Sequence, residues 1–180
     1  MIKSGRSHEG ARAAELHTGG VTGSDAVYDA AFKRAGMLRV NDLHELFAAV
    51  ETLAHSNPLK GERLAIVTNG GGPGLLAVDA LIERGGKLAT LDDKTLEELD
   101  KVLPSNWSRA NPIDIIGDAC PERYARAVDV LMNSSEIDAV LVMHSPSALA
   151  HSGETAEAVI SAVKLHPNQR RFNILTNWTG

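Results

Sequence analysis

Short aliphatic runs alternate along this chain with longer stretches whose apolar positions recur at helical spacing. Three of the runs predict buried strands, at 63–68, 137–143 and 172–176. Helical spacing follows the first strand over 75–82 and separates the last two strands over 156–163. Near-continuous apolar strands flanked by helices are typical of a parallel sheet that is covered on both faces. The pattern therefore predicts an α/β fold of that kind.

The first 55 residues follow a different pattern. They open with a glycine-rich polar segment, 4–23, for which we expect a loop. A helix is predicted from about Ser24 to Ala35, where Gly36 ends it. After a short strand at 38–40, a second helix begins at about Asp42, with Asp42 and Glu45 as a capping box.

A polar, turn-rich segment at 56–61 is the best candidate for a domain boundary. It predicts two domains, 1–57 and 62–180. The second is close to a complete α/β domain, whereas the first has too few strands to be one. We therefore expect the chain to be part of a longer protein.

Composition and charge exclude several classes of protein. With 43% hydrophobic and 23% charged residues, the 180-residue chain has the composition of an ordinary globular protein. A net charge of -5 without a Lys/Arg cluster argues against binding to nucleic acid. The single cysteine, Cys120, excludes an intrachain disulfide and suits a reducing compartment. No apolar run approaches a membrane span and no signal peptide is evident, so a cytoplasmic protein without a membrane partner is expected.

His17 is followed by small residues shortly before the predicted helix at Ser24. A neutral imidazole is a good nucleophile near pH 7. Glycines let backbone amides approach a ligand closely, and a helix N-terminus favours anions. The segment therefore fits a histidine that carries a phosphoryl group, although a solvated loop histidine would give the same pattern.

A glycine run, 70–74, comes directly after the strand at 63–68 and opens a helix. Pro73 fits the first helical turn, where its missing N–H is tolerated. Such a strand–glycine loop–helix element can bind phosphate at the carboxyl edge of a sheet. The run matches neither a Walker A loop nor the dinucleotide Gly-x-Gly-x-x-Gly pattern. A tight turn that serves close helix–sheet packing is the alternative interpretation.

Two polar loops, 111–114 and 143–147, are weaker candidates, and the second follows a strand directly. Ligands bind at such positions in open parallel sheets, but either loop could be a plain turn. No Cys/His cluster supports a metal site. No Gly-x-Ser-x-Gly elbow supports acyl transfer through serine.

Taken together, these segments resemble the NDP-forming acyl-CoA synthetases, relatives of succinyl-CoA synthetase. The resemblance covers essentially the whole chain. Residues 3–7, 10–14 and 17–25 resemble the family's phosphohistidine loop, and 28–36 continue the match. Residues 68–74, 103–104, 107–108 and 111–114 resemble the flavodoxin-like CoA-ligase domain. Leu16, Gly20, Val21 and Thr22 depart from the family's usual Ser-His-Thr-Gly-Ala-Leu-Ala-Gly.

The resemblance implies two flavodoxin-like domains, the first incomplete. It also implies a reaction in which acyl-CoA, phosphate and ADP interconvert with acid, CoA and ATP through acyl-phosphate and phosphohistidine intermediates. His17 occupies the position of the phosphorylated histidine. The residues expected at the phosphate are Gly19, Gly20, Asn69, Gly70, Gly71, Gly72 and Gly74. Those expected in substrate loops are Asn111, Asp114, Ser145, Pro146 and Ser147.

The cofactors and partners that the resemblance implies belong to a larger assembly. They are CoA, ADP or ATP with Mg, and the family's CoA-binding and ATP-grasp domains, which this chain lacks. A homo-oligomer is expected, none of these ligands should bind the chain tightly by itself, and the chain alone should be inactive. The acidic partner of His17 is expected before Met1.

Two other functions fit the sequence. The same domains could form a regulatory, CoA-sensing module of a protein lysine acetyltransferase. Alternatively, the chain could be a flavodoxin-like binding module whose glycine loops serve packing alone.

Overall fold

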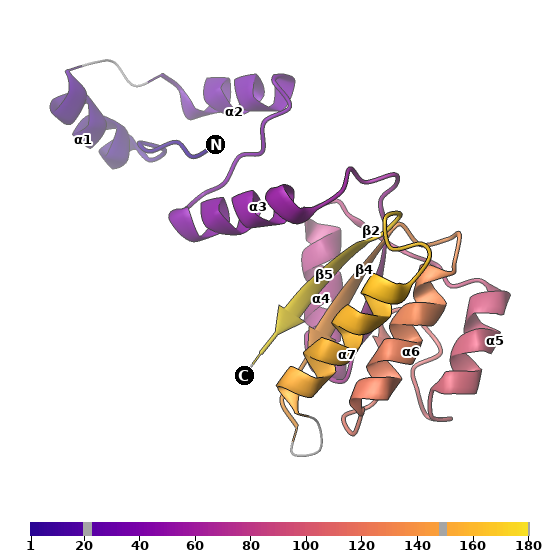
Figure 1. Ribbon diagram of the computed structural model, residues 1–180. Coiled ribbons are helices and arrows are strands. Elements are labelled where there is room, and N and C mark those ends of the chain that lie inside the picture. The colour runs from indigo at the N-terminus through magenta and orange to yellow at the C-terminus, as the bar shows by residue number, and fades with distance from the viewer. Residues whose placement is uncertain (20–22, 148–150, 180) are drawn as a thin grey trace. The chain divides into compact units, whose positions relative to one another are not determined.

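The computed structural model describes residues 1–19, 23–147 and 151–179 and divides into two compact units, Met1–Ser56 and Asn57–Gly180 (Figure 1). None of the helices within those residues is long and apolar enough to cross a membrane.

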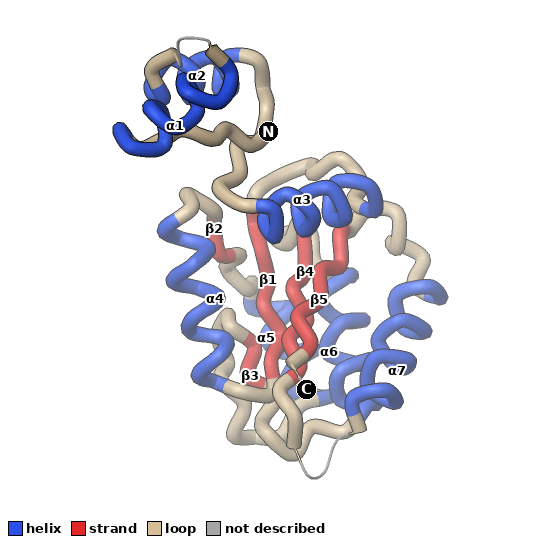
Figure 2. The backbone as a smooth tube through the Cα atoms, turned by 90° about the vertical axis from the view of Figure 1, so that its left-hand side faces the viewer, coloured by secondary structure: helices blue, strands red, loops and turns tan. Residues whose placement is uncertain are grey.

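The second unit is built around a parallel sheet. Its strands are β1 (Arg63–Thr68), β2 (Lys87–Leu88), β3 (Ile113–Asp114), β4 (Ala139–His144) and β5 (Asn173–Trp178). They are ordered β2-β1-β4-β5, and β3 also pairs with β1. β2 and β3 lie beside opposite ends of β1, because β2 pairs with Arg63 and Leu64 whereas β3 pairs with Val67 and Thr68 (Figure 2).

Helices cover both faces of this sheet. α4 (Gly71–Glu83) lies on one face, and α5 (Asp93–Val102), α6 (Pro121–Met132) and α7 (Ser152–Leu165) lie on the other (Figure 1). The main core forms under these three helices, where Val67 and Val142 of the strands meet Tyr124 and Leu131 of α6 without solvent exposure. The α/β fold with a parallel sheet and helices on both faces is thereby confirmed.

The first unit contains three helices, α1 (His8–Thr18), α2 (Asp25–Arg34) and α3 (Leu43–His55). The expected strand at 38–40 is reduced to a single parallel bridge between Ile2 and Val40. The stop at Gly36 is confirmed, because Gly36 has a φ of 66° and its amide and that of Met37 bond back to Lys33 and Phe32. Half of the predicted capping box is present, because Asp42 accepts a hydrogen bond from the Glu45 amide. The Glu45 carboxylate accepts from the Asn41 amide, whereas a capping box would require the amide of Asp42 itself.

The expectation of a loop over 4–23 is wrong for most of that segment. Ser7 caps α1 by accepting from the Gly10 amide, and the helix continues through an alanine-rich stretch to Thr18. Gly19 ends it in the left-handed conformation, with a φ of 67°. Good helix formers between a serine cap and a terminal glycine outweigh the single interior Gly10.

Candidate functional site

The start of α4 presents backbone amides to solvent at the carboxyl edge of the sheet. Gly70 is the N-cap residue and no side chain caps the helix. The first amides of a helix have no acceptor inside the helix, and Gly71 and Gly72 occupy these positions on an exposed surface. Together with the positive end of the helix dipole, they can bind an anion.

Gly70 and Gly74, in the same glycine run, allow close packing. A Cβ on Gly74 would lie 2.9 Å from Thr68 Cγ2, and one on Gly70 would lie 2.9 Å from Ser145 Oγ. The Gly70 amide donates to Thr68 Oγ1 at 3.0 Å, and that of Gly74 donates within the helix. The packing interpretation therefore describes Gly70 and Gly74, and the anion interpretation describes Gly71 and Gly72.

Asn69 links the loops that follow β1 and β4. Its Oδ1 accepts from the Ser145 amide and its Nδ2 donates to the Ser145 carbonyl, both at 2.8 Å. The side chain is 5% exposed. It therefore holds the two loops in register, and a direct contact of Asn69 with phosphate stays a prediction.

Asp114 lies beside the start of α4. Its Oδ1 accepts from the Ile116 amide at 2.9 Å, and a Cβ on Gly71 would lie 3.0 Å from Oδ2. Burial raises the pKa of Tyr124 well above its usual range, and the negative charge of Asp114 adds to this effect against the opposing Asn69 amide. Asp114 thus places a carboxylate beside the start of α4, where it would share the helix N-terminus with a bound anion.

The structure corrects the role expected for Asn111. Its Nδ2 donates to the carbonyls of Leu64 and Ala89, both at 2.9 Å, and its Oδ1 accepts from the Ile66 amide at 3.0 Å. The side chain thus fills the gap between β2 and β3 along β1. Both amide hydrogens are used inside the sheet, so Asn111 is a structural residue rather than a substrate contact.

Ser145, Pro146 and Ser147 lie where the predicted substrate loop was expected, directly after β4. Pro146 is exposed, and the two serines are half-buried. α7 begins shortly afterwards at Ser152, with His151 as an N-cap residue that provides no side-chain cap. The carboxyl edge of the second unit therefore carries three helix starts whose N-cap residues provide no side-chain cap, those of α4, α6 and α7.

His17 is exposed and lies in the last turn of α1, not in a loop. The C-terminal end of a helix carries partial negative charge. The Gly19 amide donates to the Glu15 carbonyl at 2.8 Å, so it is not free to bind phosphate as expected. Gly20 lies outside the described residues.

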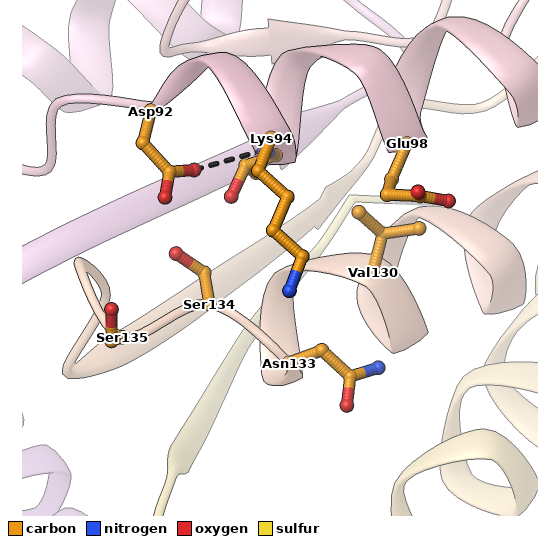
Figure 3. A pocket seen from close by; sticks show the side chains of 8 residues that line it. Asp92, Lys94, Glu98, Val130, Asn133, Ser134 and Ser135 are labelled. Carbon is orange, nitrogen blue, oxygen red and sulfur yellow. Dashed lines mark hydrogen bonds between the residues drawn. The ribbon is translucent and has the colours of Figure 1, made fainter.

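The groove in Figure 3, about 290 Å³ in volume, lies between α5 and α6 and contains none of the predicted site residues. Lys94 reaches across it toward Asn133. Asp92 caps α5 there by accepting from the Thr95 amide at 2.9 Å, and the hydrogen bonds from Thr95 lower the pKa of that carboxyl. This helix start is already satisfied, unlike those of α4 and α7.

Sequence reasoning missed the buried polar cluster behind the carboxyl edge. His144 of β4 lies against Tyr124 of α6, Ser152 of α7 and Trp178 of β5. The only sequence signal was a histidine at the end of an apolar strand, because its partners are distant in the chain.

Comparisons with known proteins identify the family of this chain. Residues 1–53 match the family model described as succinyl-CoA ligase like flavodoxin domain, and residues 64–164 match the Ligase-CoA domain. The chain is 40% identical over 165 residues to the acetate–CoA ligase [ADP-forming] II subunit alpha of Pyrococcus furiosus. That match covers 91% of this chain and 36% of the relative. The acetate–CoA ligase [ADP-forming] I of Archaeoglobus fulgidus is 38% identical, over 89% of this chain and 23% of the relative.

A solved structure gives the same result. The dinucleotide forming acetyl-coenzyme A synthetase 1 of Ca. Korarchaeum cryptofilum, in complex with phosphate and ADP, superposes with a TM-score of 0.90 at 32% identity. The match covers 97% of this chain and 38% of that one. The chain thus spans between 23% and 38% of the length of these relatives. It belongs to the succinyl-CoA-ligase-like family of NDP-forming acyl-CoA synthetases, as its sequence resemblance predicts.

Proposed function

We propose that this chain supplies two domains, 1–57 and 62–180, of an ADP-forming acyl-CoA ligase. The enzyme would interconvert acyl-CoA, phosphate and ADP with carboxylic acid, CoA and ATP. The phosphoryl group would pass from an acyl phosphate to His17 and then to ADP. The observation that carries the proposal is the uncapped start of α4, where the exposed Gly71 and Gly72 amides face solvent at the sheet edge.

The chemistry required is mainly positioning and charge stabilisation. Transfer of a phosphoryl group gains most from fixed dipoles directed at its oxygens. The backbone amides at the start of α4 are already held in place by the helix, so they can supply such fixed dipoles without a change of structure. The exposed start of α7 is suited to the same purpose, and the Asn69–Ser145 link keeps the loops that lead to these helices together.

His17 is suited to be the phosphoryl acceptor because its imidazole is exposed. Its own helix gives no help to a bound phosphate, since the carbonyl end of α1 is negative. Charge stabilisation must therefore come from other amides. The start of α2, in the same unit as His17, is one candidate source, because its N-cap residue Ser24 provides no side-chain cap.

CoA and the nucleotide would bind mainly to domains beyond this chain, and a homo-oligomer stays a prediction. No three His, Cys, Asp or Glu side chains of the described segments lie close enough to hold a metal ion. These segments therefore offer no such three-ligand set, and none of their residues is assigned to Mg²⁺. The chain alone should be inactive, which an ADP-, phosphate- and acyl-CoA-dependent ATP assay tests.

The decisive experiment is phosphorylation of the complete enzyme assembly with labelled ATP, comparing wild type with His17→Asn. We expect an acid-labile, alkali-stable label that His17→Asn abolishes. His8→Asn, at the opposite end of α1, is the matched control and should keep the label. A label that survives His17→Asn would show that another residue is the acceptor.

A second experiment tests the α4 amides separately. Gly72→Ala keeps the backbone N–H, whereas Gly72→Pro removes it in the first turn, where proline is tolerated. A Cβ at Gly72 meets nothing within 4 Å, so the Ala change is not blocked by a neighbour. We expect KM for phosphate to rise about 10-fold in the Pro variant only, as for a lost charge-assisted hydrogen bond. Equal KM values in both variants would contradict the anion site.

The alternative, a regulatory module of a protein lysine acetyltransferase, gains no support from the comparisons. The curated relatives reported above are ligases, which favours the first proposal. An assay of CoA binding and ATP production distinguishes the two functions, because a regulatory module would bind CoA without producing ATP.

A further inference from the structure

A buried histidine that the proposed chemistry does not use is the last residue of β4, at the carboxyl edge of the sheet. His144 is 1% exposed. Its Nε2 lies 3.1 Å from Ser152 Oγ, and its Nδ1 lies 3.4 Å from the Tyr124 hydroxyl. The ring stacks on Trp178 with a centroid distance of 5.3 Å. One side chain therefore connects the end of β4 with α6, β5 and the first residue of α7.

The hydrogen bonds of this cluster define the tautomer of His144. The Tyr124 hydroxyl has one hydrogen and donates it to the Met143 carbonyl at 3.2 Å. Nδ1 must then carry the proton that is shared with the tyrosine oxygen, which leaves Nε2 as an acceptor. Ser152 donates its hydroxyl hydrogen to Nε2, so the chain of hydrogen bonds runs from Ser152 through His144 and Tyr124 to Met143.

Ser152 is held at a second point. Trp178 Nε1 donates to the Ser152 carbonyl at 3.3 Å. The end of β5 is fixed in turn, because the Thr179 amide and hydroxyl both donate to the His144 carbonyl, at 3.1 and 3.0 Å. The side chain and the backbone of the first residue of α7 are thus both tied to the ends of β4 and β5.

We propose that His144 is a positioning residue that fixes the first turn of α7, and with it the amides of Gly153 and Glu154, at the phosphoryl site. This inference rests on the proposed function. The position of α7 matters because its N-cap residue, His151, provides no side-chain cap and Gly153 and Glu154 of its first turn are exposed. An error of about 1 Å in such an element costs on the order of 100-fold in rate.

Burial lowers the pKa of His144, which keeps the ring neutral at pH 7 and able to accept from Ser152. The groups that face the ring are Tyr124, Ser152 and Trp178, none of which is charged at that pH. Asp114 acts on the cluster only through its effect on Tyr124. A neutral amide in place of the imidazole should therefore preserve the arrangement.

The test is made in the complete enzyme assembly and compares variants whose side chains extend to different ring positions of His144. The amide of His144→Gln extends as far as Nε2 and can accept from Ser152, whereas that of His144→Asn reaches only the Nδ1 position. Ser152→Ala removes the other partner from a half-buried site with little risk to folding. His166→Asn is the matched control, because His166 is equally buried, at 3% exposure, and lies at the opposite end of α7.

We expect kcat/KM for phosphate to fall about 10- to 100-fold in His144→Asn and Ser152→Ala, and to stay within about 3-fold in His144→Gln. The double variant should lose no more than the worse single variant, since both remove one interaction. His166→Asn should keep full activity even if its melting temperature falls. Full activity in Ser152→Ala, or additive losses in the double variant, would overturn the proposal.

A second measurement needs no ligase activity and separates this inference from the proposed function. Nitrogen-15 spectra of the chain should show His144 as the neutral Nδ1–H tautomer, and Ser152→Ala should shift the Gly153 and Glu154 amides. An Nε2–H tautomer, or amides that do not shift, would contradict the inference. If the spectra agree but the wild-type assembly makes no ATP, the proposed function and the phosphoryl site fail, whereas the role of His144 in fixing the first turn of α7 stands.

Discussion

At the amino ends of the strands, charged groups of the second unit are paired with one another. Arg63 donates to Asp138 at 2.9 and 3.0 Å and to Glu136 at 2.9 Å, and Arg171 donates to the Ser134 carbonyl. At the carboxyl ends, the starts of α4 and α7 lack side-chain caps, and a neutral histidine is buried behind them. One edge satisfies its polar groups internally, whereas the other leaves donors for a ligand. The proposed function predicts such a contrast, with stability concentrated at the first edge and ligand binding at the second.

Among the variants that test this contrast between the two edges, Asp138→Asn should have the largest effect on stability. The substitution weakens the charged hydrogen bonds between Arg63 and Asp138, whose side chain is 10% exposed. We therefore expect the free energy of unfolding to fall by about 2 kcal/mol. Urea unfolding measures it. Glu136→Gln is the control, because that side chain is 47% exposed and should change stability by less than about 0.5 kcal/mol. Phosphate binding should be unchanged in both variants.

The effect of Asp138→Asn should also depend on pH. The Arg63 guanidinium holds the pKa of Asp138 at about 2, below the value of about 3.9 expected in the unfolded chain. Its contribution is therefore complete above pH ~4 and is lost as the pH falls toward 2. The stability difference between wild type and variant should shrink between pH 5 and pH 2. A constant difference would contradict the ion pair.

Next in size is the contrast between two glycines at the other edge. Gly74→Ala places a methyl group 2.9 Å from Thr68 Cγ2, and overpacking of this kind costs about 1–2 kcal/mol. Gly72→Ala meets no neighbour and should gain up to about 1 kcal/mol from helix propensity. Thermal unfolding of both variants measures the difference. Equal melting temperatures would show that the packing and ligand roles are not divided as we describe.

The smallest effect is expected where a cap is added to the functional edge. His151→Asp should cap α7 and stabilise the chain by about 0.5–1 kcal/mol. The new carboxylate would compete with a bound anion, so the affinity for phosphate should fall. Asp92→Ala, which removes the cap of α5, should instead cost about 1 kcal/mol and leave phosphate binding unchanged. Unaltered affinity in His151→Asp would exclude α7 from the site.

Much of the fold was predictable because local pattern and tertiary structure agree. β1 occupies the predicted residues, and α2 ends at the predicted glycine. α1 was missed because glycines at both ends and in its interior suggested a loop, although the alanine-rich stretch between them favours a helix. The segment 90–135 received no helix assignment, and it contains α5 and α6.

The candidate site was predictable only in part. A glycine run after a strand predicts backbone amides at a sheet edge, as found at Gly71 and Gly72. It does not reveal that Gly74 serves packing, since that depends on Thr68 and Pro112 in three dimensions. The association of His144 with Tyr124 and Ser152 depends on how strands and helices assemble, so neither sequence spacing nor residue type predicted it.

The side chain of Asn111 replaces part of a strand between β2 and β3, which has a consequence for chemical durability. Asparagine usually ages when the next backbone nitrogen attacks its side-chain carbonyl and forms a succinimide, with release of ammonia. The next residue is Pro112, whose nitrogen has no hydrogen to lose. The sheet therefore depends on an amide that its own neighbour shields from deamidation, the modification that would place a carboxylate against the carbonyls of Leu64 and Ala89.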